Sequence, residues 1–452
     1  MIIVKPFQSF IDWNLDRILF SKELQSHFPM EKLSNIIKPR GERIKPYNMP
    51  KIRHIVSKIR FADGNVCFTD RLIKNDMYKS CVNDLIVSNI NFEKGAFAVN
   101  VWGDVYTSTD YTSYIMDLDK IIPEYLRIAL RTKAFLQYVT EVKPKGMKTR
   151  ARYEFIKEFS IPLPSIPKQQ NLINEYHRLL YQNIMFNNKA DEELTNQLTN
   201  IQKSVSDYSK YTYAKEHEKP LLNIVRFTST DRWEVGYILT EGVIDSIIES
   251  FKYPARPIEE LQKESLFGLS MKASAELKEG MIPVLRMSNV QNGEINYDEL
   301  KYLPYECVVT SKKSNKWLLQ KGDFLIVRTN GSKDLVGKTA VFNSDDTYTY
   351  ASYLIRYRFN TDVVLPEYVN IMFMTSLVRE QIAVMKRQGG GQYNLNSDEI
   401  NSIQIPIPNI TTQRKIIHMY QYSLIKSKKF REQANDSVNN ADKYLETALY
   451  KF

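Results

Sequence analysis

The sequence has 452 residues, and its 62 Lys and Arg against 52 Asp and Glu give a net charge of +10 and a pI near 9.1. At about 150 residues per domain, this length excludes a single small module, and the cationic balance favours a polyanionic partner such as nucleic acid. Hydrophobic residues at 43% and charged residues at 25% are typical of globular proteins, so a disordered basic tail is excluded as the source of the charge.

Local patterns set further limits. No run of about 18 apolar residues occurs, and charged residues interrupt the apolar pattern of residues 1–20, so we expect no membrane span and a cytoplasmic protein. Cys67, Cys81 and Cys307 lack paired spacing and are predicted to be buried thiols. No metal site is expected, because no two His residues lie at ligand spacing.

The first predicted elements form a mixed globular half over residues 1–165. Apolar runs at 86–90 and 96–101 predict strands, and an amphipathic helix is expected after Pro123. A helical region is predicted over 166–215. Its seam residues recur at alternating steps of four and three, as in a heptad repeat: Leu194, Leu198, Ile201 and Val205.

A second globular half follows over residues 216–409, with a helix expected after Pro366. Its predicted strands are 282–285, 323–328 and 339–342. A second helical region is predicted over 410–452, with a similar seam at Val438, Leu445 and Leu449. The predicted fold class is therefore α/β or α+β, with two globular halves that alternate with two long helices.

The two halves are related by an internal repeat, which is the most informative feature of the sequence. The segment Ile161–Pro164 and Gln169 match Ile405–Pro408 and Gln413 at an offset of 244 residues (406 − 162). Other landmarks recur in the same order, namely Pro123-Glu124-Tyr125 with Pro366-Glu367-Tyr368, and Leu85-Ile86-Val87 with Leu325-Ile326-Val327. The chain therefore uses one unit twice.

Each narrow seam could belong to an ordinary core helix. Two matched seams can instead bury each other, and their polar flanks favour this alternative, an antiparallel coiled coil between the two helices. Polar residues interrupt both seams, at Asn183 and Asn187 and at Ser423 and Ser427.

A polar loop between two predicted strands of the second half is a candidate DNA contact. Asn330-Gly331 favours a positive φ and a sharp reversal, which would leave the neighbouring side chains facing outward. The candidate residues are Arg328, Thr329, Asn330, Ser332 and Lys333. An ordinary hairpin with exposed charges is the alternative.

A Gly-rich run at residues 386–394 is the second candidate. Three consecutive Gly allow close backbone approach to a partner, and the flanking residues offer charge, amides and an aromatic ring. The candidates are Lys386, Arg387, Gln392, Tyr393 and Asn394. The corresponding stretch of the first half carries Lys143, Lys145, Lys148, Arg150 and Arg152, which a solvated surface would also explain.

A third basic stretch contains Arg40, Arg43 and Lys45, and we predict that it follows the DNA backbone, or else is a solubilising loop. The sequence contains no GxGxxG after a strand, no GxSxG, no HExxH and no Asn-Pro-Pro-aromatic tetrapeptide. These absences favour a binding subunit without catalytic residues.

This arrangement resembles the specificity subunits of type I restriction-modification systems, the HsdS family. The residues that carry the resemblance are Gly322–Ser332, Leu335–Lys338, Pro366–Tyr368, Gln392–Leu395 and Ile405–Pro408 with Gln413, and in the first half Asn83–Val87, Pro123–Tyr125 and Ile161–Pro164 with Gln169.

The resemblance implies two target-recognition domains, each of which reads one half of a split DNA sequence, and helices that dock two methyltransferase subunits. S-adenosylmethionine, ATP and magnesium would be bound by methyltransferase and restriction or translocase partners, and this chain would bind none of them. The alternatives are a stand-alone DNA methyltransferase or nuclease, and a scaffold that binds only proteins.

Overall fold

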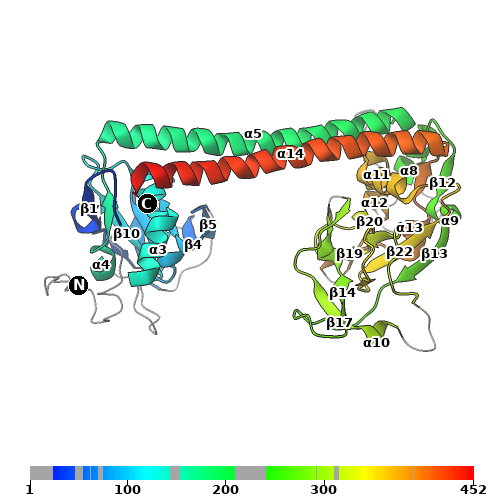
Figure 1. Ribbon diagram of the computed structural model, residues 1–452, viewed down its shortest axis with the longest axis horizontal. Helices are drawn as coiled ribbons and strands as arrows, with labels where there is room; N and C mark the ends of the chain where they lie inside the picture. The colour runs from blue at the N-terminus through cyan, green and yellow to red at the C-terminus, as the bar shows by residue number, and fades with distance from the viewer. Residues whose placement is uncertain are drawn as a thin grey trace. The chain divides into compact units, whose positions relative to one another are not determined.

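The structure is a computed structural model, shown in Figure 1, in which the chain divides into two compact units. The first unit comprises residues 1–187 and 431–452, and the second comprises residues 188–430. The residues that the structure describes are 24–45, 54–61, 63–69, 75–142, 153–208, 241–291, 293–309, 315–389 and 391–451.

The first unit contains a four-stranded antiparallel sheet and a five-stranded mixed sheet. The four-stranded sheet has the order β2 (Ile37–Pro39), β10 (Tyr111–Met116), β7 (Leu85–Ser88) and β8 (Phe97–Val99). The five-stranded sheet has the order β3 (Arg43–Ile44), β6 (Met77–Ser80), β9 (Val105–Thr107), β4 (Ile55–Ile59) and β5 (Val66–Thr69). A separate pair joins β1 (Met30–Lys32) to β11 (Ser160–Pro162). The shorter helices are α2 (Pro123–Leu130), α3 (Lys133–Val142) and α4 (Tyr153–Ile156).

The second unit repeats the central sheet and the separate strand pair. Its four-stranded sheet has the order β13 (Gln262–Phe267), β22 (Leu354–Phe359), β18 (Phe324–Val327) and β20 (Thr339–Val341), and β12 (Ala255–Pro257) pairs with β25 (Gln404–Pro406). Smaller sheets join β17 (Lys301–Pro304) to β14 (Met281–Leu285) and β21 (Thr349–Tyr350), β15 (Val290–Gln291) to β16 (Glu294–Ile295), and β19 (Thr329–Asn330) to β24 (Gln392–Asn394) and β23 (Arg387–Gly389). The shorter helices are α8 (Glu241–Glu249), α9 (Ile258–Leu261), α10 (Tyr305–Val308), α11 (Pro366–Met374), α12 (Ser376–Met385) and α13 (Ser397–Asn401).

The strands predicted from the apolar runs are confirmed in both units, and so is the mixed α and β character. The helix expected after Pro123 is divided into α2 and α3 at Thr132, and the helix expected after Pro366 is divided into α11 and α12 at Thr375. In each unit the threonine hydroxyl donates to a carbonyl three residues earlier, at 2.8 Å in the first unit and 2.7 Å in the second. Such side-chain bonds compete with the helical ladder, so the division is part of the repeated unit.

The repeated Pro-Glu-Tyr and Gln landmarks have one structural function in both units. The hydroxyl groups of Tyr125 and Tyr368 each donate to a proline carbonyl of the matched strand, β11 or β25, at 2.7 Å. Gln169 and Gln413 are fully buried. The side-chain amide of Gln169 makes three hydrogen bonds to backbone groups, two just before α2 and one just before the long helix that begins at residue 166. The side-chain amide of Gln413 makes three equivalent bonds, two just before α11 and one just before the long helix that begins at residue 410. The landmarks therefore fix the joint between sheet, short helix and long helix.

Two long helices begin at this joint. They are α5 (Ile166–Val205) and α14 (Ile410–Leu449), which start where the two helical regions were predicted to start. Ile201 and Val205, near the end of α5, are buried in the core of the second unit. Leu445 and Leu449, near the end of α14, are buried in the core of the first unit. These seam residues are therefore buried in globular cores, as expected if each seam belongs to an ordinary core helix.

The other seam residues are less buried. Leu194 and Leu198 are partly buried and pack against the core of the second unit, and Val438 is partly buried in the first. The polar interruptions of the seams make specific contacts. In the first unit the Asn183 amide donates to the Ala434 carbonyl at 2.9 Å, and in the second unit the Ser427 hydroxyl donates to the Ala190 carbonyl at 3.0 Å. Within each unit, the adjoining parts of α5 and α14 therefore contact each other through small and polar residues.

Candidate nucleic-acid interface

The second unit brings the two candidate DNA-contact segments into one small sheet. Strand β19 from the polar loop pairs with β24 from the Gly-rich run, and β24 pairs with β23. Thr329 lies opposite Asn394, and its buried hydroxyl donates to the Asn394 side-chain oxygen at 2.7 Å. The segments lie about sixty residues apart in sequence (394 − 329 = 65), so their pairing was not predictable from either motif alone.

The reversal after β19 differs from the prediction. Asn330 and Gly331 are not among the residues with positive φ, and the Asn330 side chain instead accepts the Ser332 amide at 3.0 Å. The left-handed residue is Gly337, with φ of 75°, whose amide donates to the Val327 carbonyl. The loop is therefore wider than a two-residue turn, because an Asx turn closes its beginning and a glycine closes its end.

Four cationic side chains gather around this loop, namely Lys333, Lys338, Arg379 and Lys386. Lys386 donates to the Lys333 carbonyl at 3.1 Å, and Arg379 donates to the Asp334 carbonyl at 3.0 Å. Among the residues that the structure describes, none of the four lies within ion-pair distance of a carboxylate. Lys333 and Lys386 were predicted as site residues, whereas Lys338 and Arg379 were missed. Lys338 could have been included with its loop, but Arg379 lies on α12 and gave no sequence signal.

The electrostatics of this four-cation cluster favour an anion. Burial lowers the pKa of Lys338, and the Arg379 guanidinium lowers it further. Burial also lowers the pKa of Lys386, where Asp334 opposes the shift and Arg379 and Lys333 add to it. A lowered lysine pKa means that the charged form is disfavoured in the folded protein. A phosphate at this position would restore favourable interactions to all four charges.

The other predicted residues of the Gly-rich run have different surroundings. Arg387 makes an ion pair with Glu399 at 2.6 Å, so its charge is compensated within the unit. Gln392 is exposed, and Tyr393 lies under the Lys386 ammonium group, which is 5.8 Å from the ring centroid. Arg328, at the end of β18, has its guanidinium over the ring of Phe267 at 5.3 Å.

The predicted residues of the first unit are less available. Arg40 makes a bidentate pair with Asp84, which is 2% exposed, and this hydrogen-bonded pair raises the pKa of Arg40. The surroundings of Arg40 therefore favour a structural role over the predicted DNA contact. Arg43 is exposed and pairs with Asp76 at 2.6 Å, and Lys45 is exposed. The remaining candidates lie outside the described residues, namely Lys143, Lys145, Lys148, Arg150 and Arg152.

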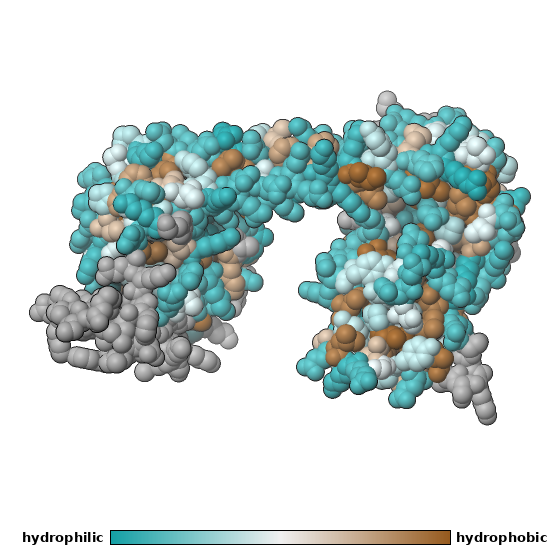
Figure 2. Space-filling model, viewed as in Figure 1, coloured by the Kyte–Doolittle hydropathy of each residue, from teal (hydrophilic) through white to brown (hydrophobic). Residues whose placement is uncertain are grey.

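Exposed hydrophobic side chains accompany the charged residues of the second unit. Figure 2 shows them over the part of the unit that contains β14, β17 and β19. The large exposed residues of this unit include Phe267, Met271, Leu277, Met287, Tyr297, Tyr305 and Tyr353. Aromatic and cationic groups on one surface are typical of nucleic-acid contacts.

Several other expectations can be compared with the structure. Cys67 is exposed and Cys81 and Cys307 are partly buried, so the prediction of buried thiols was wrong. Within the described ranges, no group of three or more potential metal-ligating side chains is found. No described helix combines the length and hydrophobicity that a bilayer span requires.

Comparisons with known proteins agree with the geometry of this site. A family profile described as "Type I restriction modification DNA specificity domain" matches residues 263–435, which include β19, β23, β24 and the four-cation cluster. Residues 263–435 are therefore similar to the domains of this DNA specificity class.

Two curated relatives extend this assignment. The EcoKI specificity subunit of Escherichia coli (strain K12) is 26% identical over 171 residues, which cover 37% of this chain and 36% of that protein. The StySPI specificity subunit of Salmonella potsdam is 22% identical over 142 residues, which cover 31% of each chain. The chain thus spans about a third of the length of the curated relatives it matches.

A solved structure from a study of complex assembly and conformational transition of the type I R-M system has the same fold. Its TM-score is 0.54 at 13% sequence identity, and the match covers 94% of this chain and 98% of that one. At this identity the likeness concerns the fold alone. The chain is thus similar to type I restriction-modification specificity subunits, both over residues 263–435 and in its fold, in agreement with the resemblance of the repeated landmarks.

Proposed function

We propose that this chain is the DNA-recognition subunit of a type I restriction-modification complex. The observation that carries the proposal is the sheet of β19, β24 and β23 together with the four-cation cluster beside it. This surface combines cations that lack carboxylate partners with amide and hydroxyl groups. Phosphate contacts supply affinity, and contacts to base edges supply sequence preference.

Each unit reads one half of a split DNA target in this proposal. The repeated sheet and joint support two readers, and the differences between their loops support two different half-sites. In the structure Asp84 is equivalent to Asp323, a register one residue away from the Leu-Ile-Val match of the sequences, so the first unit has Ser88-Asn89 where the second has Val327-Arg328. The two units therefore present different groups at equivalent positions. The target is therefore expected to be bipartite and asymmetric.

The long helices pair as an antiparallel coiled coil and dock two methyltransferase subunits. The contacts of Asn183 with Ala434 and of Ser427 with Ala190 support the pairing. Exposed apolar residues at matched positions support the docking. Tyr181 and Ile425 each lie fifteen residues after the first residue of their helix (181 − 166 and 425 − 410), and they are 61% and 67% exposed. Exposed apolar groups that recur on two equivalent faces are suited to two copies of one partner.

The chain contributes recognition and no catalytic step. The methyltransferase partners bind S-adenosylmethionine and methylate adenine, and a restriction or translocase partner uses ATP and magnesium. The complex acts in the cytoplasm on double-stranded DNA.

The test is methylation of a randomised DNA library by the chain assembled with its methyltransferase subunit. The expected product is methylated adenine within two half-sites at a fixed spacing. The methyltransferase without this chain should show no such sequence preference, and this chain without the methyltransferase should neither methylate nor cleave DNA. A single contiguous target would contradict the two-reader proposal, and activity of the chain alone would favour the enzyme alternative.

A further inference from the structure

An exposed aromatic ring is held rigidly beside the candidate interface. Phe267 ends β13 with its side chain 43% exposed, and its carbonyl accepts the Trp317 indole N–H at 3.2 Å. The next residue, Gly268, packs so closely on Ala351 that a Cβ would lie 2.3 Å from the Ala351 carbonyl oxygen. A side chain at position 268 would therefore displace the strand end that carries Phe267.

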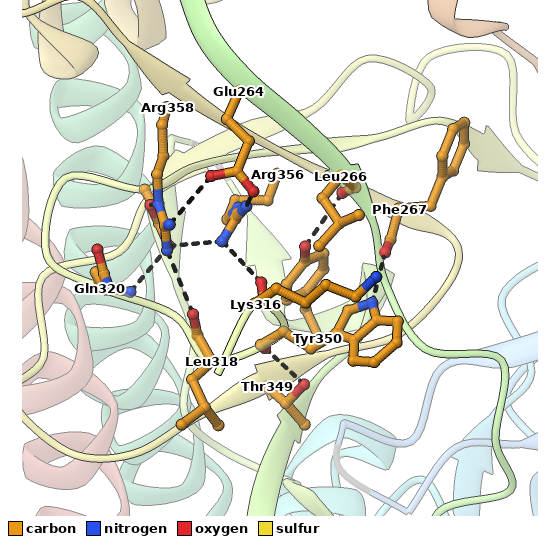
Figure 3. A network of polar contacts seen from close by, with 12 residues as sticks. Glu264, Leu266, Phe267, Lys316, Leu318, Gln320, Thr349, Tyr350, Arg356 and Arg358 are labelled. Atoms are coloured by element: carbon orange, nitrogen blue, oxygen red, sulfur yellow. Dashed lines mark hydrogen bonds and ion pairs between the residues drawn. The ribbon is translucent and has the colours of Figure 1, made fainter. Parts of the chain in front are cut away.

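A buried polar network supports this position, as Figure 3 shows. Arg356 is fully buried and donates to Glu264 at 2.5 Å and to the Lys316 carbonyl at 2.9 Å. Tyr350 donates to the Leu266 carbonyl at 3.1 Å, which is the residue before Phe267. The network thus connects the strand that carries Phe267 to the segment that carries Trp317. Buried networks of this kind rigidify the groups that they join.

Arg328 is held over the Phe267 ring. Its guanidinium carbon lies 5.3 Å from the ring centroid, a distance typical of a cation–π contact. The Arg328 backbone is bonded on both sides, because its amide donates to Tyr353 at 3.1 Å and its carbonyl accepts from Leu395 at 2.8 Å. Both the backbone and the head group of this arginine are therefore positioned before any ligand binds.

The donors of this positioned guanidinium are unused. The Arg328 Nε is buried and has no hydrogen-bond partner, and among the described residues no carboxylate or carbonyl pairs with the terminal nitrogens. An unsatisfied buried donor is costly, so the Arg328 head group would gain from a partner that the folded chain alone does not supply. Arg387, by contrast, has Glu399 as its partner.

The equivalent residue of the first unit is fully used. Asn89 and Arg328 each lie five residues after the buried aspartate that precedes the central strand, Asp84 or Asp323 (89 − 84 and 328 − 323). The backbone amide of each donates to the carbonyl of the residue just before the neighbouring strand, Asp110 before β10 and Tyr353 before β22. The Asn89 side chain donates to the Thr109 carbonyl at 3.0 Å and accepts from Thr112 at 2.9 Å. At these two equivalent positions of the described chain, only the second unit has a side chain without a hydrogen-bond partner.

We propose that Arg328 reads a guanine of the half-site bound by the second unit. This inference rests on the proposed function and names the group that gives one base pair its specificity. The planar fork of a guanidinium matches the O6 and N7 acceptors of guanine in the major groove. A fixed, partly desolvated fork discriminates between bases, whereas the neighbouring lysines, which are flexible point charges, suit the phosphates.

The experiment measures binding and methylation on a library randomised in both half-sites, with the assembled complex carrying wild-type chain, Arg328→Ala or Arg328→Lys. The wild type should require a G·C pair at one position of the second half-site. Arg328→Ala should reduce that preference by about 5- to 100-fold and leave the other half-site unchanged. Arg328→Lys keeps the charge but not the fork, so it should lose the guanine preference and keep the salt dependence of binding.

Two controls connect the effect to guanine and to the Phe267 platform. DNA with 7-deazaguanine at that position lacks N7 and should bind more weakly to the wild type but not further to Arg328→Ala. Phe267→Leu keeps an apolar side chain without a π face and should weaken the same base preference only. Arg414→Ala, an exposed arginine at the start of α14, should change neither preference.

The outcomes are distinguishable. A second half-site without guanine overturns the proposal, and so does an Arg328→Ala complex that binds all sequences more weakly with unchanged preference, which would make Arg328 a phosphate contact. A wild-type complex without any sequence preference would contradict the proposed function itself. Thermal denaturation of each variant identifies those that fail to fold, and Arg328→Lys then decides the question.

Discussion

At the scale of single residues, Gln169 and Gln413 show how one buried amide can organise a repeated unit. Each is fully buried and uses both its oxygen and its nitrogen to bond three backbone groups from two chain segments. A buried polar group without a partner costs about 1–3 kcal/mol. The recurrence of the same residue in both halves therefore follows from the geometry of the joint.

Gln413→Ala is expected to destabilise the second unit by about 2–4 kcal/mol, because the Leu365 amide and two carbonyls lose their partner. The measurement is the urea midpoint followed by circular dichroism. Gln421→Ala, at an exposed position of the same helix, is the matched control and should change stability by less than about 0.5 kcal/mol. Equal stability of both variants would contradict the structural role of Gln413.

The four-cation cluster predicts a specific change in salt dependence. Lys333→Gln with Lys386→Gln should weaken DNA binding similarly on all sequences and reduce the salt slope by about one to two units, because fewer counterions are released. The measurement is DNA affinity from about 50 to 200 mM salt, with Lys415→Gln and Lys429→Gln on α14 as a control of equal charge change. An unchanged slope would show that the cluster does not contact phosphate.

Lys338 and Lys386 of the four-cation cluster predict a pH dependence. Because the pKa values of both lysines are lowered in the folded chain, their charged forms reduce the free energy of unfolding. That loss of stability disappears as the pH rises from the lowered pKa values of the folded chain toward the ordinary value of 10.5. Bound phosphate favours the charged forms, so DNA affinity should fall over the same rise in pH. Titration of binding at pH 7.5 and at about pH 10 tests this in the wild type. The Lys333→Gln, Lys386→Gln variant should show a smaller change.

Sequence reasoning predicted part of this candidate site. Arg328 and Lys386 were identified because each lies in a polar, glycine-containing loop. Arg379 and Phe267 were missed, because no local sequence pattern distinguishes an arginine on a helix or a phenylalanine on a strand as a binding residue. The pairing of Arg40 with Asp84 was not predicted either, since the two residues are distant in sequence.

At the scale of elements, the long helices combine predicted and unpredicted features. Their starts at 166 and 410 follow from the Pro-rich landmarks and the loss of Pro and Gly that follows. The sequence did not predict which residues would bury the seams of these helices. Leu445 and Leu449 pack in a globular core, whereas Ala190 and Ser427 pack against each other with almost no exposure. Heptad spacing states which face is buried but not what covers it.

Ala190→Leu tests the contact between α5 and α14 in the second unit. The added volume has no space at a fully buried position, so we expect a loss of about 1–3 kcal/mol in unfolding free energy. Glu192→Leu, an exposed position on the same helix, should be close to neutral. Thermal unfolding measures both, and a neutral Ala190→Leu would show that the two helices do not pack tightly there.

At the scale of the whole molecule, the coiled coil that we propose would set the distance between two readers. Deleting residues 184–190 together with residues 427–433 removes one heptad from each helix and keeps the Asn183 bond to Ala434. The spacer between half-sites should shorten by about three base pairs, since seven residues span about 10 Å and a base pair about 3.4 Å.

Sequencing of methylated adenines measures this spacer. Deleting residues 184–190 alone leaves the helices unmatched and should abolish methylation. An unchanged spacer in the double deletion would contradict the role of the helices as a ruler.

The sequence by itself determined the repeat, the mixed fold, the two helix starts and the resemblance to a family, because these depend on local patterns that recur in the same order in both halves. Only the tertiary structure decided which charges are free. Among the residues that the structure describes, Arg40 and Arg387 pair with carboxylates, while Arg328 and Lys386 have no carboxylate within ion-pair distance. Ion pairing and burial depend on residues brought together from distant parts of the chain. The net charge of +10 predicted the class of ligand, and the fold selected the groups that remain available to bind it.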